Sequence, residues 1–225
     1  MKNTLKNTLE KKINIRLFYP ALFAVIVYLL SYQIPKVIDT GPYHYVSLPI
    51  DDMIPMLSIF SPIYLVSFIQ WIYALYHVIK HDTKFGYYFL DAIIIGSLIG
   101  FVIFLVYPTA TLRQPIEGNS IFDWMLRYIH SADSIKNGFP SFHCFCSTLS
   151  CFMLKSSPGI RKSILSFNVI YTILVYASTL FTKQHYFLDI PGGIVLAFLS
   201  LLLAKKISFA SLYERINHIF LIKHL

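Results

Sequence analysis

The segment "YYFLDAIIIGSLIGFVIFLVY" (Tyr87–Tyr107) decides the fold class of this chain. It is almost continuously apolar, and a helix needs about 20 such residues to cross a lipid bilayer. Apolar and polar residues do not alternate along it, as they would in each strand of a membrane β-barrel. The segment therefore predicts a membrane-spanning helix and an all-α integral membrane protein.

Five further apolar segments extend this prediction to a six-transmembrane-helix bundle. They lie at about 17–35, 56–79, 141–155, 164–182 and 187–204. The composition agrees, because 56% of the 225 residues are hydrophobic and 13% are charged, whereas a soluble domain has about 25% charged residues. The length suits a single membrane domain over residues 1–225. The first apolar run has no small-residue cleavage site, so we expect it to be retained as the first span.

The positively charged residues predict the orientation of the bundle. Fourteen of the 19 Lys and Arg residues fall in the N-terminal tail, in the loops near 80–86 and 155–163, and in the tail from 205. By the positive-inside rule these segments face the cytoplasm. We expect a multi-pass protein of the plasma membrane with cytoplasmic tails at 1–16 and 206–225. The net charge of +8 arises from these blocks beside apolar runs and does not predict nucleic-acid binding.

Two further helices are predicted at the membrane surface. In the long loop 108–140, apolar residues recur at helical spacing near 119–131: Ile121, Trp124, Met125 and Tyr128. The C-terminal tail carries a similar stripe: Phe209, Leu212, Tyr213, Ile216 and Phe220. Both patterns are typical of short amphipathic helices that lie in the interface. Long loops are often functional, which directs attention to residues 108–140.

Polar residues gather at one end of the predicted spans. The predicted topology places seven of them on the extracytoplasmic side: Arg113, Ser141, His143, Ser178, Lys183, His185 and Asp189. Arg113 and Lys183 would attract an anion, and a guanidinium suits phosphate bidentately. Helices that begin near Ser141 and Asp189 would direct free N–H groups at the same anion. The pattern indicates a phosphate-binding site.

His185 and Asp189 would give this site its chemistry. They are four residues apart, so a helical turn would place them on one face. A carboxylate bonded to one imidazole nitrogen leaves the other free as a nucleophile or base, and His143 would protonate a departing alkoxide. These are the parts of phosphoryl transfer through a phosphohistidine, without a metal or another cofactor. The alternative is that Asp189 only caps the last span, with Pro191 in its first turn, and that His185 lies outside a helix.

Two motifs resemble those of a known enzyme family. "FPSFH" (Phe139–His143) and "STLFTKQHYFLD" (Ser178–Asp189) are similar to the second and third motifs of the type 2 phosphatidic acid phosphatase (PAP2) superfamily. The family's second motif reads P-S-G-H, and its third reads S-R, five residues, H, three residues, D. The resemblance covers about residues 50–205 and implies a six-helix membrane fold. It also implies His185 as the nucleophile, Asp189 as its orienting partner and His143 as the general acid.

The first motif of that family is degenerate in this chain. The family pattern is K, six residues, R-P, but Val106 stands seven places before Arg113, where the Lys is expected. Gln114 separates Arg113 from Pro115. One of the phosphate-binding cations of the usual phosphatase is therefore absent.

The other motifs depart at single positions. Phe142 occupies the usual Gly position of the second motif, and Thr179 occupies the Arg position of the third. Lys183 is the nearest candidate to supply the missing charge. F-P-S-x-H together with K-Q-H-Y resembles the inositol phosphorylceramide synthase-like branch, in which a phosphorylated head group passes to a lipid hydroxyl.

The expected function is hydrolysis of a lipid-linked phosphate at the extracytoplasmic face, with the lipid phosphate and membrane lipids as the expected partners. Transfer of a phospho-head group to a lipid hydroxyl is the alternative. A more remote alternative is a non-enzymatic transporter, or a protein that binds haem or metal through His143 and His185. The three cysteines do not predict a metal site. Cys144, Cys146 and Cys151 share one apolar segment, and no second pair of ligands accompanies them, so we expect them to be packing residues. The sequence specifies neither the lipid nor the oligomeric state.

Overall fold

The computed structural model of the chain describes residues 14–38 and 41–221, which form helices and connecting loops without a β-strand. The elements in chain order are α2 (Ile15–Val37), α3 (Pro49–Met53), the 3₁₀ helix η1 (Ser58–Phe60), α4 (Ser61–Ile79), α5 (Thr83–Val106), α6 (Ile121–Ala132), α7 (Phe142–Ser156), α8 (Lys162–Phe181), α9 (Asp189–Leu203) and α10 (Ala210–Leu221). The all-α prediction is confirmed over these described residues.

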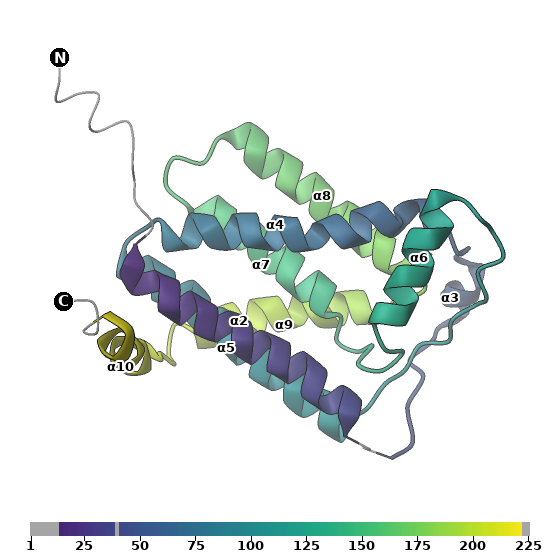
Figure 1. The fold of residues 1–225 in the computed structure, drawn as a ribbon, viewed down its shortest axis with the longest axis horizontal. Helices are drawn as coiled ribbons and strands as arrows, with labels where there is room; N and C mark the ends of the chain where they lie inside the picture. The colour runs from purple at the N-terminus through teal and green to yellow at the C-terminus, as the bar shows by residue number, and fades with distance from the viewer. Residues whose placement is uncertain (1–13, 39–40, 222–225) are drawn as a thin grey trace.

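The long helices run back and forth along one axis. Figure 1 shows α2, α4, α5, α7, α8 and α9 in this arrangement, with α3 and α6 at one end of the molecule and α10 at the other. We call these the α6 end and the α10 end. The C-terminal ends of α2, α5 and α8 and the N-terminal ends of α4, α7 and α9 lie at the α6 end. Chain segments far apart in sequence are therefore brought to one end of the bundle.

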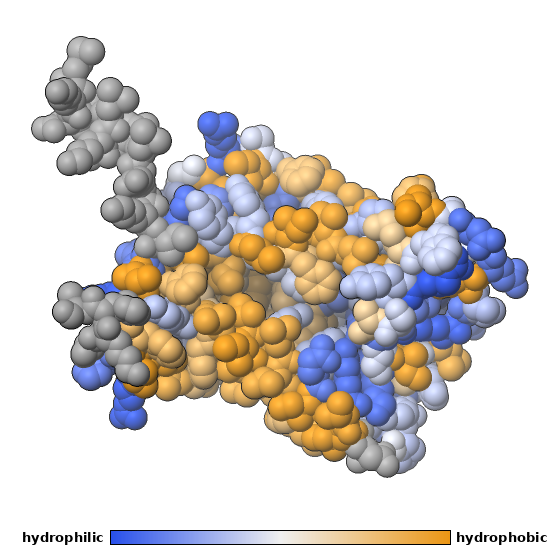
Figure 2. Space-filling model, in the orientation of Figure 1, coloured by the Kyte–Doolittle hydropathy of each residue, from blue (hydrophilic) through white to orange (hydrophobic). Residues whose placement is uncertain are grey.

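The six predicted span segments are all helical, but their lengths differ. Four helical segments are long and apolar enough to cross a membrane: Ile15–Val37, Ser58–Ile79, Thr83–Val106 and Lys162–Phe181. Helices α7 and α9 have 15 residues each, or about 22 Å at a rise of 1.5 Å per residue. The apolar helices indicate a membrane protein, and Figure 2 shows hydrophobic residues over much of the face formed by α2 and α4. The count of six spans stays a prediction.

Both predicted surface helices are present. Helix α6 begins with a capping box between Ser120 and Asp123, and it exposes Trp124 (63%) and Tyr128 (62%) to its surroundings. Helix α10 differs from a purely interfacial helix, because Tyr213 from its apolar stripe is fully buried against the bundle. The Tyr213 hydroxyl donates to Asp91 Oδ1 at 2.7 Å. A buried carboxylate on α5 needs such donors, so α10 also completes the packing of the protein.

Two glycines on α5 make room for aromatic rings of α7. Gly96 and Gly100 lie about one turn apart on α5. A Cβ atom on Gly96 would collide with the ring of Phe145, and one on Gly100 would collide with the ring of Phe142. Both rings are almost fully buried in the main core, so they have little room to move.

We predict that Gly96→Val and Gly100→Val each destabilise the bundle. Overpacking a filled core costs about 1–3 kcal/mol, which corresponds to a fall in Tm of about 5 °C for a chain of this size. Thermal unfolding in detergent measures the change. The control is Leu98→Val, because Leu98 lies between the two glycines and is 43% exposed. An unchanged Tm for both glycine variants would contradict this account of the α5–α7 contact.

Candidate active site

The N-terminal ends of α7 and α9 meet at the α6 end. Ser141 N donates to the carbonyl of Asp189 at 3.1 Å. The contact requires Gly193 on the first turn of α9, because a Cβ there would collide with the carbonyl oxygen of Ser141. The Ser141 hydroxyl accepts from Cys144 N at 3.3 Å and so caps α7. The two helix N-termini that the sequence predicted at the site are thus side by side.

His185 and Asp189 form the predicted pair, although not on a helical face. Helix α9 begins at Asp189, and His185 lies in the turn before it. The expectation that a helical turn aligns them was wrong, because His185 N bonds the carbonyl of Thr179 (3.2 Å) and the chain folds back there. Asp189 Oδ2 nevertheless accepts from His185 Nδ1 (3.0 Å) and from Tyr186 N (2.9 Å).

This pair fixes the tautomer of His185. A carboxylate oxygen accepts hydrogen bonds, so the 3.0 Å contact assigns the tautomer that carries its proton on His185 Nδ1. The side chains of His185 and Asp189 are only 5% and 0% exposed, which holds their geometry. His185 Nε2 therefore keeps its lone pair for a reaction.

His143 lies in a cage of aromatic rings. Its ring stacks on Tyr64 with centroids 4.0 Å apart, and the rings of Trp71 (5.0 Å) and Phe68 (5.4 Å) meet it edge-on. The ring centroids of His143 and His185 are 6.3 Å apart. Within the described part of the chain, the buried His143 Nε2 has no hydrogen-bond partner. The sequence prediction missed this cage, although its three aromatics recur at i, i+4 and i+7 along one predicted span.

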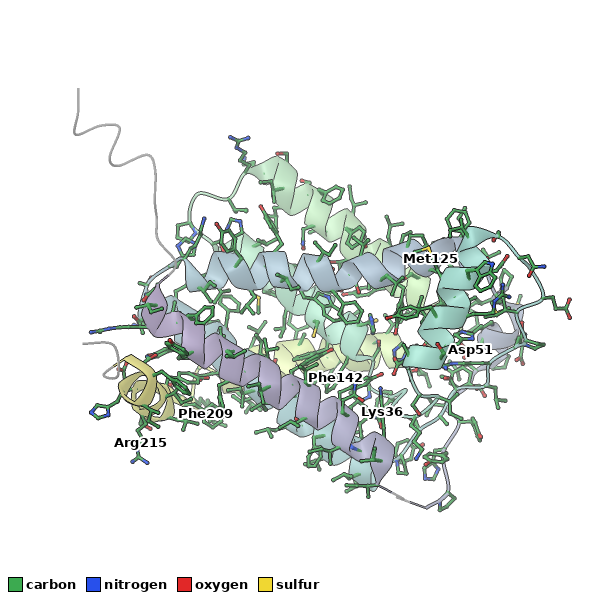
Figure 3. The ribbon with its side chains drawn as sticks, viewed as in Figure 1. Lys36, Asp51, Met125, Phe142, Phe209 and Arg215 are labelled. Carbon is green, nitrogen blue, oxygen red and sulfur yellow. The ribbon has the colours of Figure 1, made fainter. Side chains whose placement is uncertain are left out.

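His185 faces a cavity of about 330 Å³ that we call the polar chamber. Its lining residues are Ser47, Asp51, Asp52, Ile54, Thr111, Leu112, Arg113, Gln114, Leu180, Lys183, His185 and Tyr186. Three of the seven predicted site residues thus share this chamber. Figure 3 shows Asp51 at the α6 end of the molecule.

Arg113 uses most of its donors on the protein itself. Its Nη1 donates to the carbonyls of His130 (2.8 Å) and Asp133 (2.9 Å). Its Nη2 donates to the carbonyl of Ser134 (2.9 Å) and to Gln184 Oε1 (2.8 Å). The fork expected to bind phosphate bidentately is therefore occupied. Among the described residues, only its Nε–H is left without a partner.

Lys183 also has protein partners. It adopts a positive φ of 53°, and its Nζ donates to the carbonyls of Asp51 (3.0 Å) and Ile54 (2.5 Å). An ammonium has three donors, so one remains for a ligand in the polar chamber. Lys183 thereby fastens the short helix α3, which the sequence prediction missed, to the loop that carries His185.

The two predicted serines have structural partners. Ser178 is fully buried and its hydroxyl donates to the carbonyl of Val175 at 2.7 Å. The Ser141 hydroxyl is taken by the α7 cap. Neither side chain lines the polar chamber in the described structure, so their part in phosphate binding stays a prediction.

His143 faces a second cavity, of about 320 Å³, that we call the apolar groove. It lies between α2, α4, α6 and the start of α7. Its lining residues are Tyr28, Leu29, Tyr32, Gln33, Lys36, Tyr64, Leu65, Phe68, Tyr128, Ile129, Ala132, Asp133, Phe142 and His143. The site therefore has two compartments, with one histidine facing each.

Comparison with known proteins assigns the family. No curated protein and no solved structure matches the chain. Residues 43–203 match the PAP2 superfamily, and this range contains all seven predicted site residues. The comparison does not confirm the inositol phosphorylceramide synthase-like branch. Because the match covers more than half of the chain, this protein belongs to the PAP2 superfamily.

Proposed function

We propose that this chain is a membrane lipid phosphatase that hydrolyses a lipid-linked phosphate through a phosphohistidine on His185. The observation that carries the proposal is the 3.0 Å hydrogen bond from His185 Nδ1 to Asp189 Oδ2. It orients the imidazole and leaves Nε2 free to attack phosphorus. Membership of the PAP2 superfamily supports this reaction class, because it indicates phosphoric ester hydrolase or phosphotransferase chemistry.

In the first step, His185 Nε2 attacks phosphorus, and the bond between phosphorus and the lipid oxygen breaks. Asp189 stabilises the imidazolium that forms on His185. The departing alkoxide takes a proton from His143. Stacking on Tyr64, with centroids 4.0 Å apart, holds the His143 ring in position for this transfer.

In the second step, water attacks phosphorus and gives a proton back to His143. The P–N bond breaks, and its electron pair returns to His185, so the net reaction converts a phosphate ester and water into phosphate and a lipid alcohol. The third donor of Lys183 binds a phosphoryl oxygen, and the positive charge of Arg113 stabilises the negative charge on the phosphoryl group. The N-termini of α7 and α9 add their partial positive charge.

We further propose that the site faces the extracytoplasmic side. The positively charged loops and the short C-terminal connection lie at the α10 end, opposite the site: they hold Lys80, Lys84, Lys155, Arg161, Lys162, Lys205 and Lys206. The positive-inside rule assigns such an end to the cytoplasm.

Phosphotransfer to a lipid hydroxyl is the second candidate function. The apolar groove favours it, because a lipid alcohol in the groove would bring its oxygen to His143 and could replace water in the second step. The deciding experiment incubates detergent-purified protein with a panel of lipid phosphates, with and without lipid alcohols. Released phosphate supports hydrolysis, and a new phospholipid supports transfer.

The same assay addresses the remote alternatives. Activity that resists EDTA would exclude a metal-dependent reaction. The absence of both products, together with stoichiometric haem or metal in the purified protein, would overturn the proposal.

We predict that His185→Ala abolishes turnover while leaving the protein folded in detergent. Asp189→Asn should lower kcat at least about 100-fold, because the amide no longer stabilises the imidazolium. The phosphohistidine itself can be trapped with a radiolabelled substrate. A rapid base quench should preserve a labelled protein adduct that an acid quench destroys, and only in the unsubstituted protein. Glu117→Gln, an exposed loop substitution, is the control. If folded His185→Ala released phosphate at the normal rate, the proposed mechanism would be wrong.

We predict that Lys183→Met loosens the segment around α3. The substitution removes two hydrogen bonds to the carbonyls of Asp51 and Ile54, so amide hydrogen exchange across residues 48–57 should become faster. Lys205→Met, at the opposite end, should leave this segment unchanged.

The same variant tests the anion-binding role of Lys183. Inhibition by inorganic phosphate should weaken about tenfold if its third donor holds the phosphoryl group. Faster exchange with unchanged phosphate inhibition would restrict Lys183 to fastening α3.

A further inference from the structure

The apolar groove continues beyond the candidate site into the side of the bundle. A neighbouring cavity of about 230 Å³ shares Tyr28, Leu29 and Phe68 with it and extends between α2 and α4 as far as Leu75. Away from the polar α6 end, the walls of the two cavities are mainly aliphatic and aromatic. The two cavities adjoin at the three shared residues, and His143 lines the first of them.

The packing of α2 explains why this space exists. At the α10 end α2 is held close to α4, since Asn14 N donates to the carbonyl of Ile79 at 2.9 Å. Toward the α6 end the two helices diverge, as Figure 1 shows, because α2 packs along α5. Leu29 (48% exposed) and Phe68 (42% exposed) line the opening on either side. If α2 and α4 span the membrane, the groove opens sideways toward the lipid tails.

The α6 end of the groove is polar. Lys36 Nζ contacts Asp133 Oδ1 at 2.5 Å, and the Tyr32 hydroxyl donates to the same carboxylate at 3.0 Å. Burial raises the pKa of the Asp133 carboxyl, but the combined effect of the Lys36 ammonium, His143 and the Tyr32 hydroxyl leaves that pKa below its usual value. The groove thus combines an apolar channel with a charged rim, as an amphiphilic ligand requires.

The inner end of the groove holds an unsatisfied group. His143 is 6% exposed, and its Nε2 is without a hydrogen-bond partner in the described structure. A buried polar atom without a partner is uncommon and energetically unfavourable. An oxygen atom of a bound lipid, placed at this nitrogen, would satisfy it.

We infer that the apolar groove and its extension hold the hydrocarbon chain of the lipid whose oxygen meets His143, and that this lipid enters from the bilayer between α2 and α4. The inference rests on the proposed function. The ligand is a long-chain lipid alcohol or its phosphate ester, with the phosphate in the polar chamber beside His185. A larger cavity of about 450 Å³ on the α8 side of α4 carries no site residue and provides the comparison.

Steric blocking tests the groove with short and long substrates. Leu65→Trp fills the groove from the α4 wall, and Leu29→Trp fills it from the α2 wall. Two variants are used so that the test still stands if one of them does not fold. Each should raise KM for a long-chain lipid phosphate about tenfold or more. Hydrolysis of a short-chain, water-soluble phosphate ester should stay within about twofold, because that substrate has no long hydrocarbon chain to place in the groove beyond His143.

The matched control is Val66→Trp. Val66 is the next residue on α4, is 43% exposed and lines the α8-side cavity. It receives a larger increase in side-chain volume than Leu65 does. KM for the long-chain substrate should not change in this variant. An equal effect of Val66→Trp and Leu65→Trp, or an equal loss of short-chain and long-chain turnover in Leu65→Trp, would overturn the inference.

A binding experiment decides the question without turnover. A lipid phosphate with a diazirine in its chain is crosslinked to the full-length protein in nanodiscs, with excess unlabelled lipid phosphate as competitor. Competable labelling should map to α2 and α4 around Leu29 and Leu65, and Leu65→Trp should remove it. Labelling confined to the α8 side, or not competable, would overturn the groove assignment. If the groove is labelled but the protein neither hydrolyses nor transfers phosphate, the groove assignment stands and only the proposed function is wrong.

Discussion

The hydrogen bond from Ser141 N to the Asp189 carbonyl joins the N-terminal ends of α7 and α9, and the candidate site is built around this junction. Inside a bilayer each backbone group needs a partner within the protein, so irregular chain is confined to helix ends and protein-lined cavities. Gly193 lets the two helices approach closely enough for the bond to form. The catalytic residues proposed here lie within a few positions of this bond, although the N–H groups of Asp189, Ile190 and Gly192 at the start of α9 already donate to the carbonyls of the preceding turn.

The two cations near this junction, Arg113 and Lys183, order the loops around it. Arg113 donates to three carbonyls in the last turn of α6 and just after it, and to Gln184, which ties the end of α6 to the turn before α9. Lys183 binds two carbonyls of the α3 segment. Most of their donors are thereby fixed before any ligand binds. A phosphate in the polar chamber would meet a preorganised site with few free donors, in which the helix N-termini supply part of the positive potential.

The two histidines divide the site according to polarity. His185 lines the polar chamber, and His143 lines the apolar groove, with 6.3 Å between the ring centroids. The bond broken in a lipid phosphate lies at the same kind of boundary, between a charged phosphoryl group and an apolar alcohol. In the proposed reaction, an amphiphile that lies across both compartments would present its phosphorus to His185 and its leaving oxygen to His143. This division links the proposed chemistry to the lateral opening between α2 and α4.

Local sequence patterns determined a large part of this structure. Apolar runs predicted the six long helices, and apolar spacing predicted α6 and α10, because burial and helical periodicity are properties of neighbouring residues. The motif around His185 and Asp189 also predicted their contact, although the residues between them form a turn and not a helix.

Tertiary structure alone decided the remaining features. The partners of Lys183 lie 132 and 129 positions away in sequence, and α3 has no periodic signal of its own. The cage around His143 joins α4 to α7, and the groove exists because α2 packs on α5 and diverges from α4. A sequence pattern records which residues are apolar or ionisable, but which of them meet is set by how whole helices pack, since each such contact depends on the position of both helices at once.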